Sequence, residues 1–305
     1  GYLIDGTIDI KGDFIQCSGN AKSFYASEKH KVIFSGNEKQ TISINSNIAK
    51  FATLEITNTS EDGVYVSSYF NADKVIDENN KLDFADGRKT GWTLEKDETV
   101  DGFDLIYGTL DLNGYKLTVN GDLIQSGGEV KNNGGELVIT GDYKIQTSDG
   151  SASSGILNMT NETDKVTVGG SFVTNSTADH TEYLTAGTME IGGDIYQNND
   201  NSNNFKTSGN HKVVLNGLSK QTISFANAGS SYSGFNILEI NNTSEEGVCF
   251  ATDAWVQTKL YDTESVVKNS NRLYLSGTGI LADNTWSYDL NVNQNKKLDS
   301  DWSIG

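Results

Sequence analysis

Short runs of alternating apolar and polar residues recur along the chain. In residues 108–125, GTLDLNGYKLTVNGDLIQ, Leu110 and Leu112 alternate with polar residues, and Leu117 and Val119 do the same. A period of two places apolar side chains on one face of a strand. The Asn-Gly pairs in this stretch supply turns, because both residues tolerate positive φ. A helical period is nowhere sustained, so the pattern predicts an all-β chain of short strands.

Three sequence segments occur twice in the chain. HKVIFSGNEKQTISI (30–44) returns as HKVVLNGLSKQTISF (211–225), with nine of fifteen positions identical. GTIDIKGDFIQ (6–16) returns as GTMEIGGDIYQ, and LEITNTSEDGV as LEINNTSEEGV, so residues 6–64 match residues 187–248. No phrase holds an obvious catalytic residue. We interpret them as repeated packing instructions, in which Asn58 and Asn242 could form ladders between stacked coils.

A shorter repeat is based on Gly-Asp followed by apolar residues. Glycines 121, 141, 170 and 193 begin successive copies, at separations of 20, 29 and 23 residues. Periods of 20–30 residues are typical of solenoids. The 32 glycines and the absence of Pro fit a chain of hydrogen-bonded strands.

We therefore predict one elongated parallel β-solenoid, a right-handed β-helix, over residues 1–305, with aromatic-rich final coils or a cap in residues 255–305. Hairpins at each Asn-Gly and two separate β-sandwich domains are the alternatives.

The phrases also resemble a known class of proteins. GTLDLNGYKLTVNGDLIQSGGEV and the following NGGELVITGDYKIQ resemble repeats of secreted bacterial surface proteins, the filamentous haemagglutinin-like and autotransporter-passenger adhesins. KQTISF followed by a FxxLEIxNTSxxGV phrase is similar to repeats of cell-wall-associated proteins of anaerobic bacteria. The resemblance covers residue 6 to about residue 250. It implies right-handed parallel β-helices and display at the cell surface, and it carries no catalytic residues to this chain.

The net charge narrows the range of partners. The chain carries 41 acidic and 23 basic residues, a formal charge of −18. Nucleic acid and anionic membranes are disfavoured because phosphate binding needs clustered Lys and Arg. No apolar run is long enough to cross a bilayer. Glycans or host-surface ligands remain as possible classes of partner, and the chain is expected to be a monomer.

Cys17 and Cys249 are expected to be free, buried thiols.

Catalytic and metal-binding patterns are scarce. Arg88 lies in the acidic turn DFADGRKTG near Asp83 and Asp86, where a polysaccharide lyase could place its base. We favour an ordinary surface charge pair. The histidines are His30, His180 and His211, and we expect them to be structural or solvent-facing. No zinc or EF-hand pattern occurs, so no cofactor is predicted, although acidic turns leave Ca²⁺ open.

Aromatic residues outside the duplicated phrases are the candidate carbohydrate-binding residues. Trp92, Trp255, Trp286 and Trp302 could stack on sugars, or they could fill the core or cap the end of the solenoid. From these patterns we expect a non-enzymatic structural or adhesin segment of a larger bacterial surface or secreted protein, acting outside the cell. The alternative is a glycan-binding or polysaccharide-processing β-helix module, of lyase or hydrolase type.

Overall fold

The computed structural model describes most of the chain as β-strands and turns. It describes residues 3–17, 22–46, 48–79, 81–199, 203–229 and 231–262, and beyond these the strand segments 266–267, 272–275, 294–297 and 302–303. All regular elements in these ranges are strands, β1 to β29. None of the described elements is a helix of the length and hydropathy needed to span a bilayer.

The chain forms two compact units. Residues 1–92 and 103–110 make the first, and residues 93–102 and 111–305 make the second. The first unit has two four-stranded parallel sheets. One contains β1 (Thr7–Ile10), β3 (Lys31–Phe34), β5 (Phe51–Ile56) and β7 (Ala72–Ile76). The other contains β2 (Phe14–Gln16), β4 (Gln40–Ile44), β6 (Val64–Val66) and β8 (Leu82–Phe84).

Strand order shows that each coil gives one strand to each sheet. From β1 to β8, strands that are consecutive in the sequence lie in different sheets, and strands two apart are hydrogen-bonded neighbours. This is the connectivity of a solenoid, in which a coil contacts the coils before and after it.

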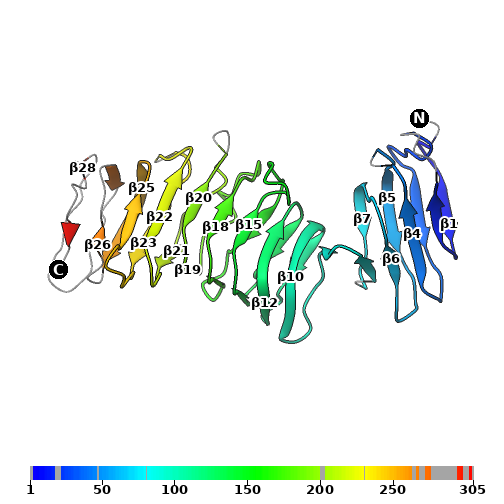
Figure 1. The fold of residues 1–305 in the computed structure, drawn as a ribbon, viewed down its shortest axis with the longest axis horizontal. Helices are drawn as coiled ribbons and strands as arrows, with labels where there is room; N and C mark the ends of the chain where they lie inside the picture. The colour runs from blue at the N-terminus through cyan, green and yellow to red at the C-terminus, as the bar shows by residue number, and fades with distance from the viewer. Residues whose placement is uncertain are drawn as a thin grey trace. The chain divides into compact units, whose positions relative to one another are not determined.

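The second unit repeats this arrangement over more coils (Figure 1). Its first stack of strands is β12 (Lys116–Gln125), β14 (Glu136–Ile139), β17 (Lys165–Val168), β19 (Thr188–Ile191), β21 (Lys212–Leu215), β23 (Phe235–Ile240) and β25 (Ala254–Asp262). Its second stack is the end of β12, β15 (Tyr143–Ile145), β18 (Phe172–Thr174), β20 (Ile195–Gln197), β22 (Gln221–Phe225), β24 (Val248–Phe250) and β26 (Val266–Val267). The remaining strands are β9 (Arg88–Thr90), β10 (Glu98–Tyr107), β11 (Thr109–Asp111), β13 (Glu129–Lys131), β16 (Ile156–Asn158), β27 (Arg272–Leu275), β28 (Gln294–Lys297) and β29 (Trp302–Ser303).

The predicted fold class, an all-β parallel β-solenoid with internal duplication, is confirmed. Pairings are parallel from β1 to β27, and the antiparallel pairs are β26 with β29 and β27 with β28. The hairpin alternative is therefore wrong at Asn113-Gly114 and Asn120-Gly121, because β12 pairs in parallel with β14 and β15, and β11 pairs with β13. One solenoid over 1–305 and a cap in residues 255–305 stay predictions.

The register of the second stack equals the predicted spacing. Leu123 pairs with Tyr143, Tyr143 with Phe172, and Phe172 with Ile195. The differences are 143 − 123 = 20, 172 − 143 = 29 and 195 − 172 = 23, which are the separations of the Gly-Asp phrases. Each phrase therefore marks the same position in successive coils.

Glycines stack in a column at the corner between the two sheets. The N–H of Gly141 donates to the carbonyl of Gly121 at 3.0 Å, and Gly170 and Gly193 each donate to the glycine below at 2.8 Å. A Cβ on Gly193 would lie 2.5 Å from the carbonyl carbon of Gly170. The glycines are needed because the backbones of neighbouring coils meet at this corner.

Inward side chains fill the core of each unit. Leu117, Val119 and Leu123 are fully buried on β12, as their alternation predicts. Aromatic rings continue the column, with centroids of Tyr143 and Phe172 separated by 5.5 Å. Burying one such side chain contributes about 1.5–3 kcal/mol, so successive coils are held mainly by apolar contact.

We expect Gly193→Ala to destabilise the second unit by roughly 1–3 kcal/mol, because the new methyl group overlaps backbone atoms that cannot move aside. Urea unfolding and amide exchange of β20 would measure the loss. Gly12→Ala is the matched control: Gly12 is the repeat equivalent of Gly193, but nothing lies within 4 Å of its Cβ position. Equal stability of the two variants would contradict close backbone stacking at this corner.

Candidate functional site

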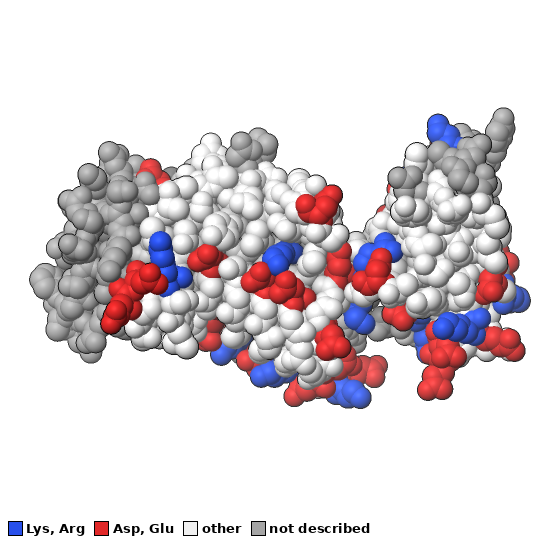
Figure 2. Space-filling view, in the orientation of Figure 1, with Lys and Arg blue, Asp and Glu red and all other residues white. Residues whose placement is uncertain are grey.

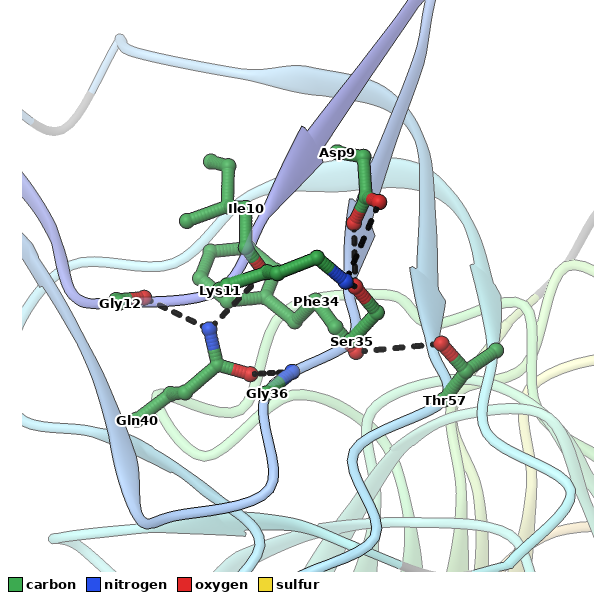
Figure 3. A network of polar contacts seen from close by, with 9 residues as sticks. All are labelled: Asp9, Ile10, Lys11, Gly12, Phe34, Ser35, Gly36, Gln40 and Thr57. Atoms are coloured by element: carbon green, nitrogen blue, oxygen red, sulfur yellow. Dashed lines mark hydrogen bonds and ion pairs between the residues drawn. The ribbon is translucent and has the colours of Figure 1, made fainter.

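The buried amide of Gln40 joins three successive coils of the first unit. Figure 3 shows its contacts with Ile10, Gly12 and Gly36. Its Nε2 donates to the carbonyls of Ile10 at 3.0 Å and Gly12 at 2.6 Å, both in the preceding coil. Its Oε1 accepts the N–H of Gly36 at 2.9 Å and the Nδ2–H of Asn58, in the following coil, at 2.9 Å. All four hydrogen bonds available to a glutamine side chain are made.

Asn58 extends this network through the second duplicated phrase. Its Nδ2 also donates to the carbonyl of Glu38 at 2.9 Å, and its Oδ1 accepts the N–H of Ser60 at 2.8 Å. The Oγ of Ser60 then accepts the N–H of Gly63 at 3.0 Å, which closes the turn. We call Gln40, Asn58 and Ser60 the polar clamp. The contact that Asn58 makes between coils is therefore with Gln40, and not with another asparagine as the expected ladder requires.

The second unit contains the same clamp, built from Gln221, Asn242 and Ser244. Gln221 donates to the carbonyl of Ile191 at 2.9 Å and accepts from Asn242 at 2.9 Å. Ser244 accepts the N–H of Gly247 at 3.0 Å. The duplicated phrases thus encode a buried, neutral hydrogen-bond network. It holds no titratable group, so its chemical role is cohesion.

The Gly-Asp phrases supply a second contact between coils. Oδ1 of Asp122 accepts the N–H of Asp142 at 2.8 Å, and Oδ1 of Asp194 accepts the N–H of Thr222 at 2.6 Å. The ammonium of Lys144 lies 2.8 Å from Asp122 and 2.9 Å from Asp142. Its hydrogen bond to Asp122 lowers the pKa of that carboxyl and raises the pKa of Lys144. These carboxylates therefore link neighbouring coils at the corner of the solenoid.

The three histidines are buried, as expected of structural residues. Nε2 of His180 accepts the N–H of Leu157 at 3.1 Å, so its proton lies on Nδ1, which donates to Ala178 at 3.2 Å. Nδ1 of His211 contacts the carbonyl of Ala186 at 2.8 Å. Burial lowers the pKa of His180 and of His211 to about 4. Both rings are therefore neutral near pH 7.

Arg88 forms the expected charge pair. Its Nε lies 2.8 Å from Oδ1 of Asp86, and its Nη2 donates to the carbonyl of Ser68 at 3.3 Å. The guanidinium also lies over the ring of Phe84, 5.0 Å from its centroid. Burial raises the pKa of Asp86, but Arg88 more than offsets this, so the pKa lies below its usual value. A role for Arg88 as a lyase base stays a prediction.

The structure places two of the four candidate tryptophans. Trp92 is half-buried in the first unit, with its ring 5.5 Å from that of Phe103 and Nζ of Lys89 at 5.8 Å from its centroid. Trp255 is half-buried on β25 of the second unit. Trp286 and the side chain of Trp302 lie outside the described residues. A carbohydrate-binding role for these residues stays a prediction.

A shallow depression of about 290 Å³ lies on the outer face of the second unit. Strands β19, β21 and β23 and two adjoining turns form it, through Glu162, Thr188, Asn210, Lys212, Ile237 and Glu239. Lys212 pairs with Glu239 at 3.0 Å, and Asn210 donates to Glu162 at 2.7 Å. The sequence reasoning missed this site, because its residues come from four separate segments of chain.

The described part of the chain contains both cysteines and most of the acidic turns. No group of three or more His, Cys, Asp or Glu is placed there to hold a metal ion. A chain without a cofactor, and Ca²⁺ as an open ligand, stay predictions. The two cysteines form no disulfide, but the expectation of burial was wrong. Cys17 is exposed just beyond β2, and Cys249 points outward from β24 and is half-buried.

No protein-family model, curated protein or solved structure matches this chain. The parallel β-helix implied by the resemblance is confirmed by the strand pairings. Membership of the haemagglutinin-like adhesins stays a prediction.

We expect Gln221→Leu to cost roughly 3 kcal/mol, because it removes the partner of the Gly217 N–H, one hydrogen bond of the Asn242 amide, and one hydrogen bond to each carbonyl of Ile191 and Gly193. Urea unfolding would measure the loss. Ser224→Ala on the outward face of β22 is the control and should change little. A stable Gln221→Leu protein would show that apolar contact alone holds these coils.

His180 and His211 predict a loss of stability in mild acid. Their folded pKa of about 4 lies below the unfolded value of about 6.5, so the unfolded chain binds more protons between these values. This contribution is complete above pH 6.5 and is lost as the pH falls to 4, on the order of 3 kcal/mol for each histidine. Urea midpoints from pH 7.5 to pH 4.5 would measure the slope.

His211→Asn is the matched variant for this test, since Nδ2 of asparagine can replace Nδ1–H of His211. The variant should flatten the pH dependence by the uptake of up to one proton. An unchanged slope would show that the His211 ring is not neutral and buried in the folded protein.

Proposed function

We propose that this chain is a non-enzymatic, adhesin-type structural segment of a larger bacterial surface or secreted protein, acting outside the cell. The observation that carries the proposal is the twice-built polar clamp. Gln40 and Gln221 are buried at equivalent corners, and each binds the coils on both sides. A chain that builds the same cohesive network between coils twice suits a rigid support.

The charged side chains support the same proposal. Lys31 pairs with Glu55, Lys165 with Glu190, and Lys212 with Glu239, each between neighbouring coils. In the view of Figure 2, acidic and basic atoms lie side by side and a broad area is uncharged. Such a surface disfavours phosphate-rich partners and favours solubility.

Antibody labelling of the organism that encodes the chain tests display. Intact cells should be labelled, and brief treatment with external protease should remove the label. Labelling only after permeabilisation would contradict the proposed location. A matched antibody to a cytoplasmic protein controls for lysis.

Glycan binding is the second candidate, because the depression presents carboxylates, an amide and an ammonium to solvent over a volume suited to one sugar unit. Neutral sugars offer hydroxyl donors that the carboxylates of Glu162 and Glu239 can accept. A glycan array would test it with Glu239→Gln as the site variant and Thr118→Ala as a distant control. Trp92→Ala and Trp255→Ala test the aromatic residues separately.

An activity assay separates binding from catalysis. Polyuronates and neutral polysaccharides, with and without Ca²⁺, should give no new reducing ends and no unsaturated products. Turnover that is lost in Arg88→Ala would replace the structural proposal with a lyase. Turnover that survives this change would point to carboxylates elsewhere in the chain.

A further inference from the structure

The first coil of the first unit has an open edge. β1 and β2 are the outermost strands of their sheets, and among the described residues no strand pairs with the outer edge of either. Ile8 of β1 faces inward yet is 39% exposed, whereas its register partner Val32 is 1% exposed. An unpaired edge with inward apolar side chains is a template for another strand.

The second unit contains a covered copy of the same coil. Its residues 187–197 repeat residues 6–16, so Met189 corresponds to Ile8 and Ile195 to Phe14. Met189 and Ile195 are fully buried, because Val166 of β17 and Phe172 of β18 stack on them in parallel register. The chain thus shows what covers this phrase: a coil with aliphatic or aromatic residues at the matching inward positions.

Gly12 points to the same arrangement. Its copy Gly193 must be glycine, because a Cβ there would meet the backbone of the coil below at 2.5 Å. Gly12 has no such neighbour and does not adopt the left-handed backbone conformation. Nothing in the described surroundings of Gly12 requires a glycine at this position, whereas a further coil stacked on this corner would require one.

Lys11 decides which kind of coil fits. It replaces Gly192 of the copy, where a Cβ would lie 2.7 Å from the carbonyl oxygen of Gly169. At the equivalent corner of β14, however, Thr140 carries a side chain above Asn120 and Gly121. Its N–H donates to Val119 at 3.0 Å, and its Oγ1 accepts the N–H of Gly121 at 2.8 Å. An Asn-Gly corner below therefore admits a side chain at this position.

The charges of β1 do not obstruct the edge. The ammonium of Lys11 contacts Ser35 at 3.1 Å and Asp9 at 3.6 Å on the outer face (Figure 3). The inward positions, Ile8 and Ile10, carry no charge. Natural edge strands often prevent pairing with an inward charge, and β1 has none.

We propose that the edge formed by β1 and β2 is a docking surface for one further parallel β-solenoid coil. The coil places two aliphatic residues against Ile8 and Ile10, an Asn-Gly corner below Lys11 and Gly12, and an apolar residue against Phe14. Residues 116–134 of this chain have that chemistry, with Leu117, Val119, Asn120-Gly121 and Leu123 at the required positions. A two-fold related second copy would pair these edges antiparallel, unlike the parallel pairings of β1 to β8.

A fusion of the full chain tests the docking. Residues 116–134 replace residues 1–5, so that they precede Gly6 as they naturally precede Gly135. A second fusion carries Leu117→Asp and Leu123→Asp in the added coil only. Exchange of amide hydrogens in residues 7–16 should slow at least tenfold in the first fusion relative to the natural chain and to the second fusion. Equal exchange in the two fusions would overturn the proposal.

Gly12→Ala gives an independent readout. In the natural chain the substitution should leave exchange of β1 and β2 unchanged. In the first fusion the new methyl group meets the added glycine corner, as a Cβ on Gly141 would meet Gly121 at 2.7 Å, and protection should be lost. Protection that survives Gly12→Ala in the fusion would show that the coil does not dock in this register.

Sedimentation of the natural chain separates a second copy from an added coil. We expect a monomer at micromolar concentration. A dimer that Ile8→Lys dissociates would assign the edge to self-association and overturn the proposal. Neither result depends on the proposed cell-surface function, because both measure the edge of the purified chain.

Discussion

Each coil of this protein depends on its neighbours, because the backbone groups of a parallel strand point out of their own coil. The N–H of Gly170 finds its acceptor on Gly141, and the N–H of Gly193 finds its acceptor on Gly170. The inward side chains have the same dependence, since a single coil encloses no core. Most of the local chemistry of the chain follows from the need to satisfy both faces of every coil.

The corners show how this need is met without buried charge. Gln40 and Gln221 each use both amide hydrogens and the carbonyl oxygen, and their partners are backbone groups and an asparagine. A buried carboxylate or ammonium would cost far more desolvation energy than a neutral amide. Charged residues such as Lys144 and Asp122 lie instead on the outer side, where solvent screens them and they still bridge coils.

The separation of buried neutral amides from charged residues on the outer side bears on function. His180, His211 and Arg88 are held in contacts that stabilise the fold. The depression beside Lys212 lies on the outer face of the strands. A solenoid can therefore keep one interior while its surface or its ends acquire a partner. The contrast between Ile8 and Met189 illustrates this, because the same phrase is open in one unit and covered in the other.

The sequence by itself determined the strands, the inward faces and the register. Leu117 and Val119 are buried as their alternation predicts, and the spacing of glycines 121, 141, 170 and 193 equals the offset between paired strands. These features are local or periodic, so one coil's sequence carries them. The tertiary structure alone decided that Asn58 binds Gln40, that Cys17 is exposed and that Trp92 packs beside Phe103. Those contacts join segments distant in sequence, and which groups meet depends on the coil that stacks above or below.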